Sequence, residues 1–201
     1  MYNDFYNFKL AQMVDSRERI LWQSKPDKKC FILESIFNPF AGFALLWFLF
    51  DAFMFFAFSS SSTIDMNGTP TPTNEAMKTI VPFFILHMMP VWIYLGGVLF
   101  TFSRYKNTEY IITDKAVYIS GGTFSCNNER KEIEKLTNIG TRQGFFDTHL
   151  GVGDVILEKY TSGYGKNSHE VVVAINDIPD FQNVYSMLID LRNKLQKSNQ
   201  A

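Results

Sequence analysis

Residue types that build catalytic and metal centres are scarce in this sequence of 201 residues. It has three histidines and two cysteines, and neither set has the close spacing of a metal-binding motif. Cys30 and Cys126 lie far apart and do not form the repeated pattern of a disulfide framework. We therefore expect two plain thiols, no bound metal and no cofactor.

An excess of charge of either sign is also missing, since the formal net charge is −1. Nucleic-acid-binding domains usually carry concentrated positive charge, so nucleic acid is not an expected partner. The N-terminal segment MYNDFYNFKLAQMVDSRER does not have the charged-then-apolar order of a secretory signal. We therefore expect no cleaved export signal.

Motifs of known enzyme classes are not found either. The stretch GVGD at 151–154 precedes a strand-like run rather than a helix, which is not the arrangement of a phosphate-binding loop. The histidines, His87, His149 and His169, are scattered, and no nucleophile–base pattern involves them. We therefore expect a protein that is not an enzyme.

Apolar and aromatic side chains are abundant, and most of the 20 phenylalanines fall in one apolar region. It contains two runs, 36–58 and 80–102, and each exceeds the ~20 residues that a helix needs to cross a bilayer. Residues 59–79 between them are rich in Ser, Thr and Pro, which is typical of a solvated loop. The pattern predicts a two-helix transmembrane hairpin in a lipid bilayer.

Basic residues precede the first run and directly follow the second, whereas the loop between them has only Lys78. By the positive-inside rule, both termini should be cytoplasmic and the loop external. The sequon Asn67-Gly68-Thr69 in that loop is interpreted as a chance match. We expect five basic residues to set this topology and to touch anionic headgroups without specificity: Lys25, Lys28, Lys29, Arg104 and Lys106.

One ionisable residue lies inside each predicted span, Asp51 in the first and His87 in the second. Counted from the loop ends of the two runs, both lie at a depth of roughly 10–12 Å, at ~1.5 Å per residue. Ionisable groups in a span face protein or water and need a partner. We predict that Asp51 and His87 form an intramembrane polar pair, within the hairpin or across a dimer. Its role stays open between fixing helix register, handling protons or ions, and contacting another membrane protein.

Four further residues in the apolar runs have a plain structural interpretation. Pro82 and Pro90 predict tolerated kinks in the second span, because each frees a backbone carbonyl. Trp47 and Trp92 are predicted to be packing residues. Near the N-terminus, apolar residues recur at helical spacing between positions 2 and 14, on the membrane surface or against a domain.

After residue 103 the pattern changes to short runs rich in β-branched and aromatic residues. We predict a hairpin formed by 109–113 and 116–120 and a strand at 133–139 within the charged segment. Two later strands are predicted at 154–160 and 169–177. After Pro179, apolar residues follow i, i+3, i+4, i+7 spacing, which predicts an amphipathic helix with one buried face. This succession indicates an α+β domain in which the helix covers a sheet.

The segments YKNTEYIITDKAVYIS (105–120) and FFDTHLGVGDV (145–155), with the closing helix, resemble the bacterial pleckstrin-homology-like (PH-like) domain. RERILWQSKPDKK (17–29) is similar to the motif that precedes the membrane spans in such proteins. The resemblance implies a PH-like β-barrel or sheet capped by a C-terminal amphipathic helix, in a multi-pass protein of the bacterial inner membrane. It implies no reaction. Ala116 departs from the family pattern, which usually has a basic residue there.

The expected organisation is therefore a cytoplasmic N-terminal segment, a first span, an external polar loop, a second span and a cytoplasmic PH-like domain. Their bounds are 1–35, 36–58, 59–79, 80–102 and 103–197. Residues 104–201 carry 12 basic and 12 acidic side chains, and the first turn of the domain has a single Lys115. Lipid phosphates need a basic cluster, so we expect no specific phosphoinositide binding.

The favoured hypothesis is a non-catalytic, membrane-anchored interaction or scaffold module that binds a membrane protein or self-associates, by strand addition or helix docking. Candidate contact residues are Phe145, Phe146 and Tyr164. Two adjacent phenylalanines in a polar loop mark either a plug in the core or a contact patch. The alternative hypothesis is an accessory subunit of a membrane transporter or envelope machine that uses Asp51 and His87. A lipid-facing enzyme has the least support.

Overall fold

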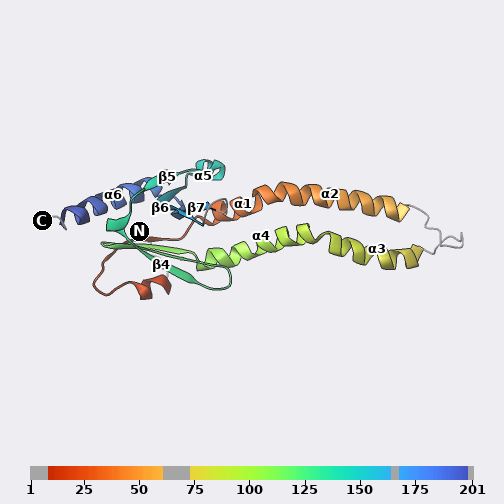
Figure 1. The fold of residues 1–201 in the computed structure, drawn as a ribbon, viewed down its shortest axis with the longest axis horizontal. Coiled ribbons are helices and arrows are strands. Elements are labelled where there is room, and N and C mark those ends of the chain that lie inside the picture. The colour runs from red at the N-terminus through yellow and green to blue at the C-terminus, as the bar shows by residue number, and fades with distance from the viewer. Residues whose placement is uncertain (1–8, 61–72, 164–167, 199–201) are drawn as a thin grey trace. The chain divides into compact units, whose positions relative to one another are not determined.

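A computed structural model describes residues 9–60, 73–163 and 168–198 (Figure 1). The chain folds into two compact units. The first contains the described parts of Met1–Glu34 and Thr101–Ala201, and the second is drawn from Ser35–Phe100. The first unit holds the strands, and the second holds the apolar helices.

The first sheet of the domain has four antiparallel strands in the order β1-β2-β3-β4. The predicted hairpin is confirmed, and its turn is closed by Thr113, whose Oγ1 accepts the N–H groups of Lys115 (3.2 Å) and Ala116 (2.9 Å). The strands are β1 (Ile20–Ser24), β2 (Glu109–Thr113), β3 (Ala116–Gly121) and β4 (Asn127–Glu132).

The second sheet has three antiparallel strands, β5 (Gly140–Arg142), β6 (Gly153–Ser162) and β7 (His169–Ile178), in that order. The two predicted later strands are therefore confirmed. The predicted strand at 133–139 is wrong. Ile133 begins a short 3₁₀ turn, η2 (Ile133–Lys135), and Ile133 and Leu136 are both buried because residues three apart share one face of such a turn.

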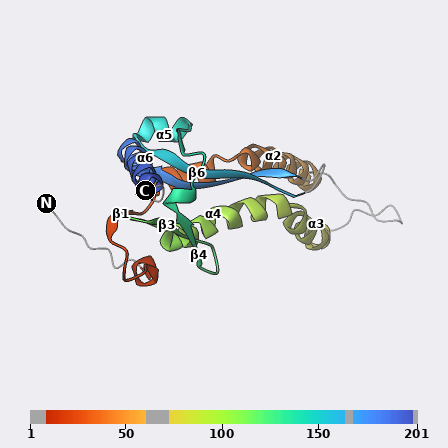
Figure 2. The same cartoon turned by 60° about the vertical axis from the view of Figure 1, so that its left-hand side comes forward.

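The described strands form two separate sheets and no closed barrel, so the barrel form of the fold prediction is wrong and the sheet form holds. The predicted amphipathic helix is confirmed as α6 (Phe181–Ser198), which contacts β5 and β6 (Figures 1 and 2). The core lies between α6 and the two sheets, and both sheets contribute to it. Its buried residues include Tyr110, Ile112, Val117, Val155, Leu157, Ile175, Ile178, Phe181, Val184 and Leu188.

The other face of the first sheet is covered by a short N-terminal helix, η1 (Lys9–Met13). Its Leu10 packs on Ile111, Ala116 and Tyr118, so every residue of β2 is buried. In the described part of the N-terminal segment, Leu10, Ala11 and Val14 therefore lie against the domain, whereas Met13 is exposed. Ala116 is 0% exposed, so this position has no room for the basic side chain that is usual in the family pattern.

The second unit is built on α2 (Pro39–Ser60) and α3 (Thr73–His87), which lie side by side (Figures 1 and 2). α2 begins three residues later than the first apolar run, because the Asn38 side chain accepts the N–H groups of Phe40 (2.8 Å) and Ala41 (3.2 Å) and so caps the helix. A separate helix, α1 (Lys28–Ile36), precedes it. The sequon at 67–69 lies outside the described residues.

The second apolar run is divided between α3 and α4 (Met89–Asn107), with a break at Met88 and a bend of 51°. Pro90 explains the bend, because its ring removes an N–H and cannot pack against the carbonyl four residues earlier. Pro82 lies inside α3. α3 begins at Thr73, before the second apolar run starts.

Candidate functional site

Asp51 and His87 meet between α2 and α3. Asp51 Oδ1 lies 2.7 Å from His87 Nδ1, and the Asp51 side chain is only 2% exposed. The His87 ring stacks between Trp47 (5.1 Å between ring centroids) and Phe83 (5.5 Å). Aromatic rings thus hold the imidazole in position, and the carboxylate orients it through one nitrogen.

Two tryptophan side chains donate hydrogen bonds to backbone carbonyls near the bend between α3 and α4. Val91 N–H donates to Met88 O (2.9 Å), so the His87 carbonyl does not receive its usual helical partner. Trp47 Nε1–H donates to that carbonyl (2.9 Å), and Trp92 Nε1–H donates to Ile85 O (3.0 Å). Such donors let a broken helix exist where water is scarce. Both tryptophans are therefore hydrogen-bond donors, and Trp47 also packs on the His87 ring, whereas Trp92 is 51% exposed.

A hollow of about 270 Å³ lies beside the Asp51 carboxylate, and its other lining residues are apolar. Asp51 Oδ2 is buried and accepts no hydrogen bond from any residue that the structure describes. The wall of the hollow is formed by Phe48, Ala52, Phe55, Val81, Phe84, Ile85 and Met88. One carboxylate oxygen is thus left available in an otherwise apolar surface.

The apolar side chains of α2 point mostly away from the rest of the chain. Leu46, Phe53 and Phe56 are 70%, 69% and 72% exposed. By length and composition, Pro39–Phe58 is the one described helix that suits a membrane crossing. The bent pair Ile80–His87 and Met89–Asn107 passes the same criterion only when taken as one span.

The five candidate headgroup residues do not share one environment. Lys25 forms an ion pair with the buried Glu109 (3.2 Å). Lys28 and Lys29 are exposed in the first turn of α1. Arg104 and Lys106 are exposed in the last turn of α4, where the Arg104 guanidinium lies 5.7 Å from the centre of the Phe31 ring.

The candidate contact loop is a short helix, α5 (Phe145–Leu150). Phe145 is 73% exposed, so it is not a plug in the core, and its ring packs against Phe146 (5.4 Å) and His149 (4.7 Å). Phe146 is half-buried. Tyr164 lies outside the described residues.

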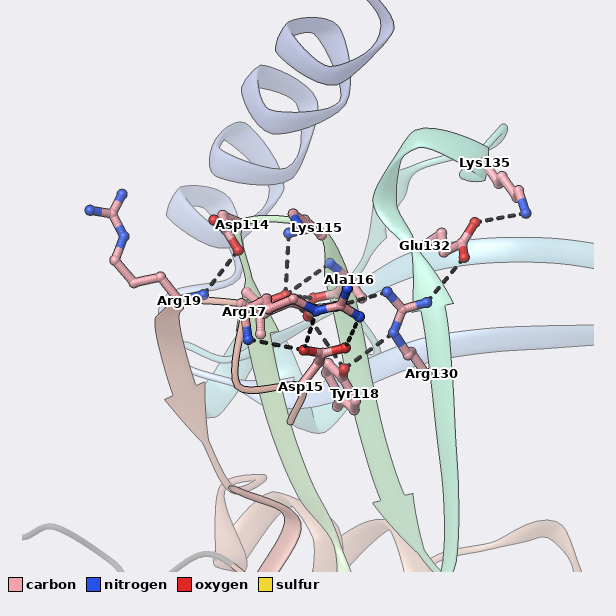
Figure 3. A network of polar contacts seen from close by, with 12 residues as sticks. Asp15, Arg17, Arg19, Asp114, Lys115, Ala116, Tyr118, Arg130, Glu132 and Lys135 are labelled. Carbon is pink, nitrogen blue, oxygen red and sulfur yellow. Dashed lines mark hydrogen bonds and ion pairs between the residues drawn. The ribbon is translucent and has the colours of Figure 1, made fainter. Parts of the chain in front are cut away.

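Two sequence motifs of the family resemblance come together beside the first hairpin turn (Figure 3). Arg19 N–H donates to Asp114 Oδ1 (3.0 Å), and Asp114 N–H donates to Arg19 O (3.1 Å). The Glu18 carboxylate accepts from Arg130 (2.8 Å) and Thr113 (2.6 Å). These contacts join the segment before β1 to the β2–β3 turn and to β4.

Hydrogen bonds in this network favour the ionised form of its carboxylates. Burial raises the pKa of Glu18, but hydrogen bonds from Arg130 and Thr113 outweigh it, so that the pKa lies below its ordinary value. Hydrogen bonds from Arg17 likewise lower the pKa of Asp15. Asp15 and Glu18 thus each have an arginine partner, which is typical of a network that stabilises structure.

A second polar cluster has a different character. One ligand-capable atom each of Cys30, Glu34, Asp147 and Asp177 lies within 4.8 Å of the others. Burial raises the pKa of Asp177 to about 7, with a further increase from Glu34, and burial also raises the pKa of the Cys30 thiol. Acids here face acids and a thiol.

No sequence motif reveals this cluster, because its members come from α1, α5 and the end of β7. Only the i, i+4 spacing of Cys30 and Glu34 on one helix face gave a local signal. Asp147 is 117 residues from Cys30, and no spacing rule connects them.

Two antiparallel sheets with a C-terminal helix packed on the core define a PH-like domain as the class of this unit. Residues 75–192 match the sequence profile described as the bacterial PH domain, and the chain belongs to this family. Searches of curated proteins and of solved structures found no match. PH domains are generally interaction modules without catalytic activity. The matched range begins within α3 and includes α4, so it extends beyond the strands and α6.

Proposed function

We propose that the protein is a membrane-anchored interaction module that presents its PH-like domain at the cytoplasmic face of the bacterial inner membrane. The outward-facing apolar surface of α2 carries this proposal. Each large apolar side chain left in water forgoes about 1.5–3 kcal/mol of transfer free energy. A bilayer supplies an apolar environment for the whole length of such a helix.

The proposed topology has two spans, with α3 and α4 acting together as the second. A bend within a span is compatible with lipid here, because tryptophan side chains complete the carbonyls at the break. Exposed basic residues flank both spans on one side: Lys28, Lys29, Arg104 and Lys106. Their position favours cytoplasmic termini and non-specific contact with anionic headgroups.

The domain would then bind a membrane protein or a second copy of the chain. Support comes from α5, where Phe145 and His149 form an exposed aromatic patch on a charge-balanced domain. Exposed aromatic residues are favoured at protein interfaces. With equal numbers of acidic and basic residues, the domain offers little to a polyanionic inositide headgroup.

Co-purification from native membranes in mild detergent tests this proposal. The wild type is compared with Phe145→Ser and with Phe124→Ser, which removes another exposed ring (84% exposed) from a different turn. We expect a stoichiometric partner, or a dimer, that is lost in the Phe145 variant and kept in the Phe124 variant. A chain that is monomeric and alone in all three preparations would contradict the interaction function.

A second candidate function is an accessory subunit of a membrane transporter or envelope machine. It is favoured by the buried Oδ2 of Asp51, which has no hydrogen-bond partner among the described residues and would accept a donor from a partner helix or a moving proton. Asp51→Asn separates the two possibilities. Loss of assembly would assign a structural role, whereas intact assembly with a pH-dependent transport defect would assign charge handling.

A further inference from the structure

The thiol and carboxylates of the second polar cluster converge from three segments of the domain. Cys30 and Glu34 lie on α1, Asp147 lies on α5, and Asp177 lies near the end of β7. Cys30, Asp147 and Asp177 are at most 2% exposed, and Glu34 is exposed. The cluster therefore has a closed inner side and one residue on the solvent side.

Hydrogen bonds explain only part of this arrangement. The Cys30 thiol donates to Asp147 Oδ1 (3.0 Å), and Gly144 N–H donates to Asp147 Oδ2 (2.7 Å). Asp177 Oδ1, in contrast, is buried and has no hydrogen-bond partner among the described residues. A buried carboxylate oxygen without a donor is costly unless something else approaches it. The lack of a donor to Asp177 Oδ1 among the described residues points to a ligand independently of the clustering of the four side chains.

Compensating positive charge lies outside the cluster. Arg142 bonds to Asp154 Oδ2 through Nε (3.0 Å) and Nη2 (2.8 Å), and Asp154 Oδ1 accepts the Asp177 N–H (3.0 Å). These contacts occupy the guanidinium with another acid and orient the Asp177 backbone. Three carboxylates and a thiol are thus left facing each other, which is the arrangement that a divalent cation stabilises.

We propose that Cys30, Glu34, Asp147 and Asp177 form a binding site for a divalent transition-metal ion of the zinc class. A thiolate ligand favours zinc, cobalt or ferrous iron over magnesium and calcium, which prefer oxygen alone. When the metal–sulfur bond forms, the thiol proton leaves to solvent. This inference is independent of the membrane-anchoring function.

The distances permit such a site after a small contraction. Zinc holds sulfur at ~2.3 Å and carboxylate oxygen at ~2.0–2.2 Å, so tetrahedral ligands lie about 3–4 Å apart. The Cys30 and Asp147 atoms already have this separation, and all four atoms lie within 4.8 Å. Exposed Glu34 provides the path by which the ion enters and the ligand that closes over it.

A bound ion would connect α1 to the body of the domain. α1 is the helix that directly precedes α2 in the chain, and Asp147 and Asp177 belong to α5 and β7. The ion would therefore hold the segment leading into the first proposed span against the second sheet. Metal binding should stabilise the domain, because the ligands come together only in the folded chain.

Titration of the full chain in mild detergent, stripped of metal, with Co²⁺ and Zn²⁺ tests the site. We expect one ion per chain, a near-ultraviolet thiolate-to-cobalt absorption band, and a rise of the unfolding midpoint with Zn²⁺. Cys30→Ser should abolish the band. Asp177→Asn and the exposed Glu34→Gln should weaken binding by at least about tenfold, the lower limit for loss of even an outer-shell partner.

Matched controls are Cys126→Ser, which removes the exposed thiol, and Asp190→Asn, which removes an exposed carboxylate of α6. Both should bind the ion as the wild type does. The proposal is overturned if the wild type retains no ion, or if the cobalt band survives Cys30→Ser or disappears in Cys126→Ser. If Cys30→Ser does not fold, Glu34→Gln still tests the site, because the Glu34 side chain is exposed and is not part of the core. Unchanged metal affinity in Glu34→Gln would also overturn the proposal.

Discussion

The two units of this protein treat the same residue types in opposite ways. In the domain, Leu157 and Leu188 are 0% exposed, whereas Leu46 and Leu86 of the apolar unit are 70% and 74% exposed. Leucine burial therefore differs between the units, and the exposed leucines of α2 and α3 are those that the proposed lipid environment would cover.

Polar groups show the same contrast. In the network beside the β2–β3 turn, Glu18 has several donors, including a charged one. In the apolar unit, one oxygen of Asp51 contacts the His87 imidazole, and the other has no hydrogen-bond partner within the part of the chain that the structure describes. The first arrangement stabilises a fold in water, whereas in the second a donor from water or from a partner would have to complete the free carboxylate oxygen.

The largest expected effect comes from truncating the same residue type in each unit. Leu157→Ala should reduce the free energy of unfolding of the domain by about 2–5 kcal/mol, because it leaves a cavity in the core. Leu46→Ala should change it by less than about 0.5 kcal/mol. Urea unfolding in detergent, followed by the loss of β-sheet circular dichroism, measures both. Equal losses would remove the contrast between the units.

A smaller loss is expected where the second sheet meets α6. A Cβ at Gly153 would lie 2.9 Å from Phe181 Cγ and 3.0 Å from Gln143 Cγ, so Gly153→Ala should destabilise the domain by about 1–3 kcal/mol. The control is Gly140→Ala on β5, where a Cβ would meet nothing within 4 Å. The same unfolding assay applies. A Gly153 variant as stable as the Gly140 variant would show that the helix moves aside without cost.

The polar network of the domain should give a pH-dependent contribution. The pKa of Glu18 is lowered in the folded state, so its stabilisation is fully present above the ordinary value of 4.5 and is lost as the pH falls through the folded value. Glu18→Gln should cost about 1 kcal/mol at neutral pH and flatten this acid limb of the stability profile.

Unfolding midpoints measured from neutral pH to below pH 4 test this expectation. Glu129→Gln, which replaces an exposed acid of β4 with 58% side-chain exposure, is the control. If the control flattens the profile as much as Glu18→Gln does, the acid sensitivity belongs to general surface charge and not to this network.

The smallest effect is expected in the apolar unit. Trp47→Phe removes the hydrogen bond to the His87 carbonyl and should destabilise the helical hairpin by about 0.6 kcal/mol, the average for such bonds in membranes. Phe53→Leu, on an outward-facing position, should have less effect. SDS unfolding curves followed by helical circular dichroism compare the two. A larger loss of stability for Phe53→Leu than for Trp47→Phe would show that α2 does not contact α3 through the face that carries Trp47.

Local patterns were sufficient for much of the domain. The Thr113-Asp114-Lys115 turn and the helical spacing of Phe181, Val184 and Leu188 each specify their element within a few residues. Apolar residues alone do not distinguish a strand from a 3₁₀ turn, so the spacing of Ile133 and Leu136 predicts a strand where the structure has such a turn. The division of the strands into two separate sheets depends on which strands pair, and local sequence patterns do not specify this pairing.

The candidate sites depend on contacts that no local rule contains. Asp51 and His87 could be matched by depth because two antiparallel helices have a simple geometry. No comparable geometry relates Cys30 to Asp147 or Asp177, since α1, α5 and β7 meet only after the domain has folded. The exposure of Phe145 likewise follows from the orientation of α5, which the sequence does not specify.

In the proposed arrangement, lipid surrounds the apolar unit and the domain lies in the cytoplasm. Labelling of intact spheroplasts with a membrane-impermeant maleimide tests it, using the native exposed Cys126 as the domain reporter and Ser62→Cys as the loop reporter. We predict that the loop reporter is labelled in intact spheroplasts and that Cys126 is labelled only after lysis. Labelling of Cys126 before lysis, or of neither residue until lysis, would contradict this arrangement.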